Sequence, residues 1–162
     1  MTRSSGRALR GMVLALALMA ARGVRADPIP AGQLAVGLNL EGGLGLKNAG
    51  TLLPTVLGGY AVYKGIIVGV LGSYGLVGIP LWRTGAFGEI YLGPDSIRPY
   101  AQIRLEGIGV GRDATFAVGF SFGLSFQFTQ HFLLNATFGF DGNVKTVGES
   151  YGIAGIGARY VF

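Results

Sequence analysis

The sequence contains no cysteine and little charge. Asp, Glu, Lys and Arg together make up 13% of its 162 residues, against roughly 25% in a typical soluble domain. Without cysteine there is no disulfide framework, no thiolate metal site and no lipid anchor on a cysteine side chain. The sequence also lacks an uninterrupted apolar run of the roughly 20 residues that a membrane-spanning helix needs. Cross-links and transmembrane helices are therefore excluded as the means that hold this fold together.

The first residues have the pattern of an export signal. Three arginines precede an uncharged apolar run over residues 12–21, and small residues then suit cleavage before Asp27. Such a charged start, short apolar core and small-residue end are typical of a secretory signal peptide. We therefore expect residues 1–26 to be a signal peptide and residues 27–162 to form one domain.

Removal of that segment changes the charge of the chain. Five of the thirteen basic residues lie within residues 1–26, together with none of the eight acidic residues, so eight basic and eight acidic side chains remain. The excess positive charge of the full sequence belongs to the export signal. A nucleic-acid partner or another anionic partner is therefore not expected.

Side chains alternate between large apolar and small along residues 114–128. Phe, Val and Leu dominate one parity, and Thr, Ala, Gly, Ser and Gln fill the other. A period of two indicates a β-strand. The pattern returns over residues 132–141 after a short turn at 129–131, so the two segments predict a hairpin.

Weaker alternation fills the rest of the chain and predicts eight strands in all. Each is long enough for the roughly 9–11 residues of a tilted membrane-spanning strand. An even count places both chain ends on one side, where the turns are short, and leaves most of the longer connections on the other side. Pro54 is expected to mark the far end of its strand. The six further strands are predicted over residues 33–46, 51–63, 65–77, 84–92, 97–107 and 151–162.

The composition of the two faces distinguishes a membrane barrel from a soluble one. A soluble, lipocalin-like barrel would turn its apolar face inward and carry Lys and Glu outside. Here the second face is small and uncharged, and an eight-stranded lumen is too narrow for a full row of phenyl rings. We therefore predict an all-β, closed antiparallel up-and-down transmembrane barrel. The predicted lipid-facing residues are Phe116, Val118, Phe120, Phe122, Leu124, Phe126, Phe128, Phe132, Leu134, Phe138 and Phe140.

The chain ends on an alternating strand with a terminal aromatic residue. Ala158, Tyr160 and Phe162 share one parity, and Phe162 is the last residue. This end resembles the carboxy-terminal signal of outer-membrane barrel proteins, and the predicted architecture resembles the small eight-stranded barrels of OmpA and OmpX type. The resemblance implies residence in the outer membrane of a Gram-negative bacterium, contact with membrane lipid and lipopolysaccharide, and the barrel assembly machinery as a partner in biogenesis. We expect no cofactor and a monomer.

Charged side chains gather on the inward parity of the predicted strands, because charges in a membrane protein belong where they can pair or meet water. A turn at residues 93–96 would place Arg83 opposite Glu106 and Glu89 diagonal to Arg98. The set describes either a salt-bridge network that fills the lumen or a polar conduit, and the narrow barrel favours the filled lumen. The predicted lumen charges are Glu41, Arg83, Glu89, Arg98, Arg104, Glu106 and Arg159.

Two further interpretations concern the ends of the barrel. Rim carboxylates, Glu106, Asp113, Asp141 and Glu149, could bind a divalent cation, although scattered carboxylates are usually only solvated. Aromatic residues near the strand ends suit girdles at the two membrane interfaces. These residues are Tyr60, Tyr74, Trp82, Tyr91, Tyr151 and Tyr160.

The expected function is a structural or envelope-interaction role, exercised through the embedded scaffold and the short outer connections at residues 79–83 and 141–150. The alternatives are a lipid-modifying enzyme, of lipid A deacylase or acyltransferase type, and a small pore. The enzyme would need a serine nucleophile beside a histidine base. The chain has a single histidine, His131, in a predicted turn, whereas Ser121 and Ser125 lie further along the neighbouring strand. No catalytic residue is therefore predicted.

Overall fold

The computed structural model describes residues 29–44, 51–77, 80–93, 96–143 and 150–162. The predicted signal peptide lies outside these residues, as does most of the connection expected at 141–150. Among the described residues, no helix has the length and hydropathy to span a membrane.

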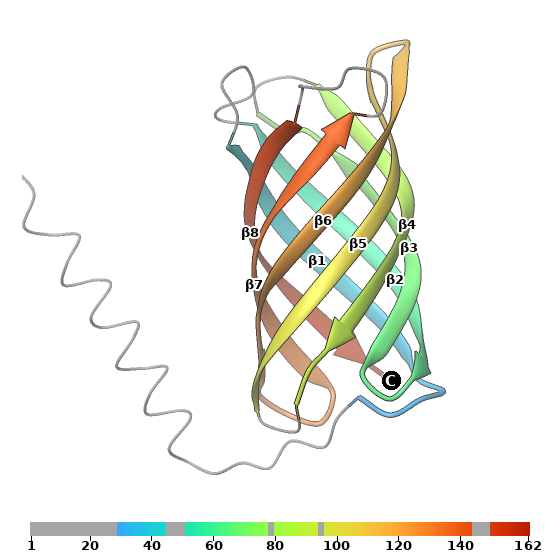
Figure 1. Cartoon of the computed structure of the whole chain (residues 1–162), viewed down its shortest axis with the longest axis vertical. Helices are drawn as coiled ribbons and strands as arrows, with labels where there is room; N and C mark the ends of the chain where they lie inside the picture. Colours follow the sequence, from blue (N-terminus) through green and yellow to red (C-terminus); the bar gives the residue numbers. More distant parts are fainter. Residues whose placement is uncertain (1–28, 45–50, 78–79, 94–95, 144–149) are drawn as a thin grey trace, which may run out of the picture.

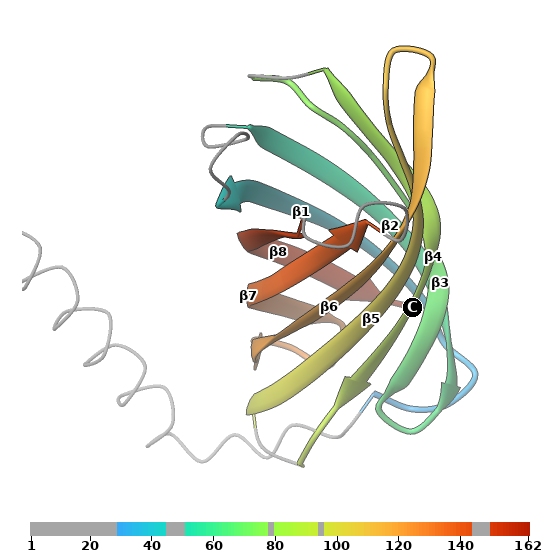
Figure 2. The ribbon, with the colours of Figure 1, turned by 45° about the horizontal axis from the view of Figure 1, so that its top comes forward.

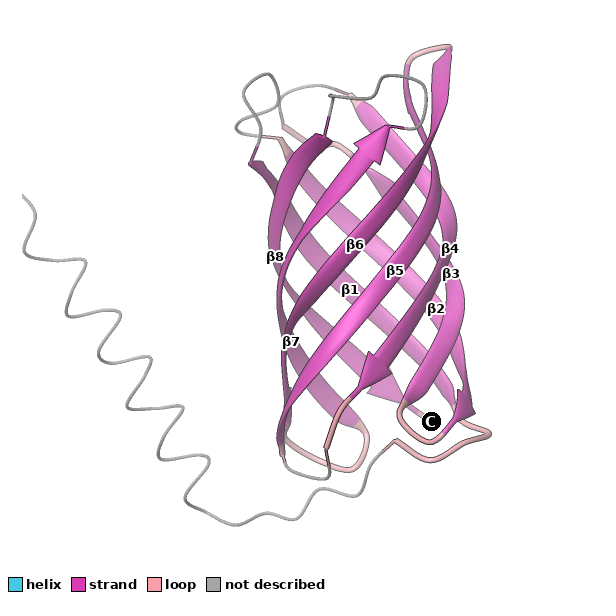
Figure 3. Ribbon diagram, in the orientation of Figure 1, coloured by secondary structure: helices cyan, strands magenta, loops and turns pink. Residues whose placement is uncertain are grey.

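Eight antiparallel strands close into a barrel in which each strand pairs with its sequence neighbours and β8 pairs with β1 (Figures 1 and 3). The predicted closed antiparallel all-β barrel is confirmed, and so is the number of strands. The start of β1 and the carboxy-terminus lie at the same end of the barrel, which is the lower end in Figure 1 and is called the lower end from here on. The strands are β1 (Leu34–Leu44), β2 (Leu52–Tyr63), β3 (Ile66–Tyr74), β4 (Leu81–Tyr91), β5 (Ile97–Val110), β6 (Asp113–Gln127), β7 (Phe132–Asn143) and β8 (Ser150–Val161).

The hairpin of β5 and β6 is longer than the sequence pattern predicts. A connection was expected over residues 108–113, but Val110 pairs with Asp113 and only Gly111 and Arg112 lie between the strands. Gly111 has a φ of 61°, a left-handed conformation that glycine adopts without steric cost. As a result this hairpin rises above the neighbouring strand ends (Figures 1 and 2).

The start of β4 also differs from the expectation. The strand begins at Leu81 rather than at residue 84, so Arg83 is a buried strand residue and not part of an outer loop. Pro54 lies inside β2 as its third residue, opposite Leu40. Its place near the upper strand end agrees with the restriction of proline to strand margins.

The register between β4 and β5 corrects the predicted charge pairs. Glu106 lies opposite Gly85, not opposite Arg83, and Glu89 lies opposite Gln102, so the diagonal placement of Arg98 is wrong as well. The observed register differs from the predicted one by two residues. A shift of two leaves every side chain on the same face, and for that reason alternation alone could not reveal it.

Apolar side chains close the lower part of the lumen. Ile29, just before the barrel, is almost fully buried among them, and its carbonyl accepts a hydrogen bond from the backbone N–H of Gly65. A second, smaller apolar cluster includes Leu53, Leu81 and Ile108. The large cluster consists of Ile29, Ala35, Leu57, Ala61, Ile67, Leu71, Phe87, Tyr91, Tyr100, Leu133 and Val161.

Candidate functional site

The barrel interior holds a network of ionised side chains, and this network is the candidate site. All seven charged residues predicted to face the lumen are buried, each with at most 2% of its surface exposed. They come from β1, β4, β5 and β8 and occupy the inward parity of those strands. Their burial follows from strand geometry, because alternate residues point to opposite faces.

Arg83 on β4 is the centre of the upper part of the network. Its Nη2 donates to Glu41 Oε2 in a close ion pair, and its Nη1 lies 3.1 Å from Asp141 Oδ2. Glu106 Oε2 is further away, 3.8 Å from Arg83 Nε. Two neutral acceptors complete the surroundings of the guanidinium group, the hydroxyls of Thr55 at 3.0 Å and Ser73 at 2.9 Å.

Arg104 on β5 contacts the same three carboxylates. Its Nη2 lies 2.6 Å from Asp141 Oδ1, its Nε 2.9 Å from Glu106 Oε1 and its Nη1 3.5 Å from Glu41 Oε1. Two guanidinium groups therefore share three carboxylates from β1, β5 and β7. Charge-assisted pairs of this kind are short and strong in a medium of low dielectric constant.

Asp141 is the member of this network that the sequence interpretation missed. It was placed at the outer rim as a candidate cation ligand, but it is fully buried on β7 and paired with both arginines. Glu106 is buried in the same way, so the rim-cation hypothesis is wrong for these two residues. The described residues contain no group of three acidic or histidine side chains able to hold a metal ion. Parity with Asn135 and Thr137 was the signal that could have placed Asp141 inside.

Asn39 joins this upper part to a lower group of charges. Its amide Nδ2 donates to Glu41 Oε1 at 3.2 Å, and its Oδ1 accepts from Arg159 Nη1 at 2.6 Å. Arg159 Nη2 in turn lies 2.7 Å from Glu89 Oε1. Space for Arg159 comes from Gly37, where a Cβ atom would lie 2.5 Å from the arginine Cδ.

Neutral polar groups surround the lower charges. Gln102 Nε2 donates to Glu89 Oε1 at 2.7 Å, and the Tyr91 hydroxyl donates to Glu89 Oε2 at 2.8 Å. The Tyr100 hydroxyl forms a close hydrogen bond with Thr137, and its ring stacks on Tyr91 with centroids 5.5 Å apart. Tyr91 is therefore an interior residue, and its assignment to an aromatic girdle is wrong because it shares the inward parity of β4.

The remaining girdle residues have different positions. Tyr60, Tyr74 and Tyr160 are exposed on the outer face, 44–56% accessible. Trp82 is partly covered and lies against Gly109, where a Cβ atom would come within 2.5 Å of the indole ring. The side chain of Tyr151 lies outside the described residues.

The network carries equal numbers of opposite charges. The buried charges of the described residues are four arginines, Arg98 included, and the four carboxylates of Glu41, Glu89, Glu106 and Asp141. Arg98 is placed lower in the lumen and donates to Gln127 in a close hydrogen bond. A buried ion needs a partner because its desolvation costs several kcal/mol. Among the residues that the structure describes, the buried charges therefore balance, and the ion pairs connect β1, β4, β5, β7 and β8.

The structure does not bring the histidine together with the two serines. His131 is exposed in the lower turn, where its Nδ1 lies 2.7 Å from the carbonyl oxygen of Val161 and its ring stacks on Tyr160. Ser121 and Ser125 are fully buried in the lumen on β6, and the Ser121 hydroxyl donates to Gln102. The pair that acyl transfer would need is not formed among these described residues.

The outer face is a continuous apolar belt. The residues predicted to face lipid point outward, and the side chains of Phe116, Phe120, Phe122 and Phe140 are about half exposed, 48–53%. At the lower end of β8, the rings of Tyr160 and Phe162 meet edge to face with centroids 4.9 Å apart, and the backbone N–H of Phe162 donates to the carbonyl oxygen of Leu34. A closed barrel with apolar side chains outside and paired charges inside is the architecture of a transmembrane barrel.

Comparison with solved structures agrees with this class. The N-terminal β-barrel domain of OprF from Pseudomonas aeruginosa has a TM-score of 0.70 at 15% identity, covering 82% of this chain and 98% of that domain. Neisserial surface protein A has a TM-score of 0.57 at 17% identity over 80% of this chain and 95% of that one. Ail from Yersinia pestis has a TM-score of 0.54 at 10% identity, with coverages of 81% and 99%.

These likenesses define the fold. The sequence matches no family model, and no curated protein matches it. The chain has the eight-stranded barrel fold of small bacterial outer-membrane proteins, which confirms the architectural resemblance to the OmpA and OmpX type. At identities of 10–17%, the likeness shows a common fold and does not show that the chain shares the activity of any of these proteins.

Proposed function

We propose that the protein is an integral outer-membrane barrel with a structural or envelope-interaction role, and that its lumen is a packed support and not a conduit. The proposal is supported by the belt of apolar side chains, which suits lipid on all sides of the barrel. Outer-membrane lipid, lipopolysaccharide during residence and the assembly machinery during biogenesis are its proposed partners. A monomer is the proposed state.

The buried ion-pair network is the observation that carries this proposal. Arg83 and Arg104 lie across the lumen between carboxylates of three strands, and all five side chains are at most 2% exposed. A conducting path would need water along the axis, whereas these side chains occupy it with direct contacts. Eight strands enclose an interior that side chains are able to fill.

Single-channel recording in planar bilayers tests the packed lumen. Protein purified from outer membranes, with its folded state established by heat-modifiable migration on a gel, should give no stable, sizeable conductance. The same recording on the Arg83→Ala, Arg104→Ala double variant is the matched control, because it removes the side chains that fill the upper lumen. Stable conductance of the wild-type protein would overturn the proposal in favour of the small pore.

A lipid-modifying enzyme is not part of the proposal, because the separation of His131 from Ser121 and Ser125 gives it no support. Mass spectrometry of lipid A from cells that express the protein provides the test. We expect unchanged lipid A. Altered acylation that disappears in His131→Ala would establish the enzyme instead.

A further inference from the structure

The pair of β1 and β8 closes the barrel, and we call it the seam. The other seven strand pairs join neighbours in the sequence, so a connection along the chain holds each of them near its register. The register of a hairpin depends on its turn. The seam joins the two ends of the barrel and has no turn, so its register must come from contacts between the two strands themselves.

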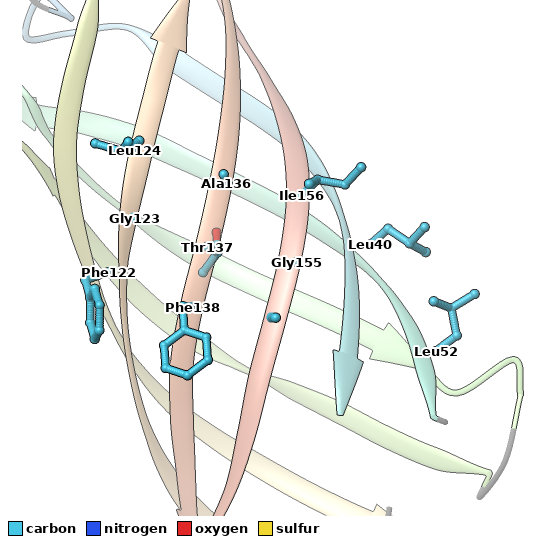
Figure 4. A pocket seen from close by; sticks show the side chains of 11 residues that line it. Leu40, Leu52, Phe122, Gly123, Leu124, Ala136, Thr137, Phe138, Gly155 and Ile156 are labelled. Atoms are coloured by element: carbon cyan, nitrogen blue, oxygen red, sulfur yellow. The ribbon is translucent and has the colours of Figure 1, made fainter. Parts of the chain in front are cut away.

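Glycine lies opposite a larger side chain in four successive inward pairs of the seam. The glycine belongs to β1 in the first and last of these pairs and to β8 in the two between them. The pairs are Gly37 with Arg159, Asn39 with Gly157, Glu41 with Gly155, and Gly43 with Ile153. The outward pairs follow no such rule, since Leu40 and Ile156, both large, face each other where they line a shallow outer groove (Figure 4). Outward side chains are free to diverge, whereas inward ones share a narrow lumen.

The side chains opposite Gly37 and Gly157 occupy the space that these glycines leave. A Cβ atom on Gly37 would lie 2.5 Å from Arg159 Cδ. A Cβ atom on Gly157 would overlap Asn39 Oδ1. An added methyl group at either position would therefore overpack the lumen.

Arg159 is held over Gly37 by two partners. Its Nη1 donates to Asn39 Oδ1 at 2.6 Å, and its Nη2 lies 2.7 Å from Glu89 Oε1. The guanidinium group cannot leave the space over Gly37 without losing these contacts inside the lumen, where an unpaired charge is costly. Asn39 Nδ2 in turn donates to Glu41 Oε1 at 3.2 Å. The large side chains of three successive pairs are thus linked to one another along the seam.

A slip of the seam by two residues would keep every side chain on its face, so the apolar pattern does not prevent it. In one slip Arg159 would lie opposite Ala35, and in the other it would lie opposite Asn39. Both residues carry the Cβ atom that Gly37 lacks, so among these three registers Arg159 fits beside β1 only in the observed one. The register of the seam also decides the stagger of the closed barrel, and with it the width of the lumen.

We propose that the glycine pairs of the seam set the register in which this barrel closes, with Gly37 opposite Arg159 as the decisive pair. In the observed register each large side chain of the four pairs meets a glycine, and each slip places at least one of them against another side chain. The inference goes beyond the proposed function, because it concerns how the ring closes and not what its surface contacts.

Disulfide trapping reads the register directly, because the chain has no cysteine of its own. The pair Leu38→Cys, Ala158→Cys reports the observed register, since these residues face each other on the outer side of the seam. The pair Leu38→Cys, Ile156→Cys reports one slip, and the pair Leu38→Cys, Tyr160→Cys reports the other. Opposite Cα atoms lie about 4.5–5.5 Å apart, within reach of a disulfide, whereas diagonal neighbours lie beyond its limit of about 7 Å.

The exchange variant Ala35→Gly, Gly37→Ala is the main test. It moves the position without a Cβ atom by two residues along β1 and keeps the composition of the chain. Arg159 then fits opposite residue 35, in the slip that brings Leu38 opposite Ile156. In protein refolded into lipid vesicles, we expect cross-linking of Leu38→Cys with Ile156→Cys to rise by about tenfold over its level in the otherwise unchanged chain.

Gly139→Ala is the matched control. Its Cβ atom would meet Ser121 on β6 as closely as a Cβ atom on Gly37 would meet its partner, but a short turn holds the register between β6 and β7. We expect the control and the unchanged seam to cross-link in the observed register alone. Where the exchange variant does not refold, Glu89→Gln combined with Arg159→Ala decides. This double variant removes the large side chain together with the charge of its carboxylate partner, and both slipped pairs should then cross-link.

Two results would overturn the proposal. The first is cross-linking in the observed register alone in the exchange variant or in the double variant, because the register would then be fixed elsewhere in the barrel. The second is slipped cross-links in the control that are as frequent as in the exchange variant, because crowding anywhere in the lumen would then loosen the seam.

Discussion

Replacement of Arg83 by methionine is the sharpest perturbation of the lumen. Arg83→Met keeps an unbranched side chain of similar length but removes the cation that contacts Glu41, Asp141 and Glu106. Three buried carboxylates would then share Arg104 alone. Breaking a buried ion pair by removing one partner costs about 3–5 kcal/mol. We expect the free energy of unfolding to decrease by an amount in that range.

Urea unfolding in lipid vesicles measures this change. Trp82 is the single tryptophan of the chain and lies on β4 next to Arg83, so its fluorescence reports directly on the affected strand. Linear extrapolation gives the free energy in water, and heat-modifiable migration on a gel provides an independent measure of the folded fraction.

Two variants separate the loss of the ion pairs from a general effect of the substitution. Arg112→Met removes an arginine from the exposed turn between β5 and β6 and should change stability by no more than about 0.5 kcal/mol. Glu41→Gln combined with Arg83→Met removes opposite charges together and should cost less than the sum of the two single changes, by about 0.5–3 kcal/mol. A loss below about 1 kcal/mol in Arg83→Met would refute the view that the network supports the barrel.

Three further predictions address the belt, the interior glycines and the carboxy-terminal end. Phe122→Arg, near mid-height of the barrel, should lower the free energy of unfolding in vesicles by about 2–4 kcal/mol. Phe128→Arg, beyond the end of β6, should lower it by about 0–1 kcal/mol. Equal decreases would mean that the belt does not meet hydrocarbon. Gly123→Ala should destabilise the barrel by about 1–3 kcal/mol, because its Cβ would lie 1.9 Å from a backbone carbonyl oxygen of β7. Gly72→Ala should not destabilise the barrel, because no atom lies within 4 Å of the position of its Cβ. Similar melting temperatures of the two variants would contradict this prediction. Phe162→Ser should lower the amount of folded barrel in outer-membrane fractions without changing the stability of refolded protein, and unaltered assembly would rule out a terminal recognition signal.

Much of the fold could be predicted from alternation alone. The phenyl row from Phe116 to Phe128 and its small counterpart required strands, a narrow lumen and an outward apolar face. Six of the seven lumen charges needed only their parity within clear strands. The seventh, Arg83, is buried on β4, although the predicted strand began one residue after it. The predicted positions of Asp141 and Tyr91 were wrong, because each residue lies near a predicted strand end, where an exposed role was assumed.

The amino-acid sequence by itself determined the number of strands and the face on which nearly every side chain lies, because a period of two is a local property of extended backbone. Only the tertiary structure decided which charges meet. Registers that differ by two residues preserve both faces, so the choice between them depends on closure of the whole ring and on the fit of side chains inside it. The same closure brought Asp141 to Arg83 and Arg104.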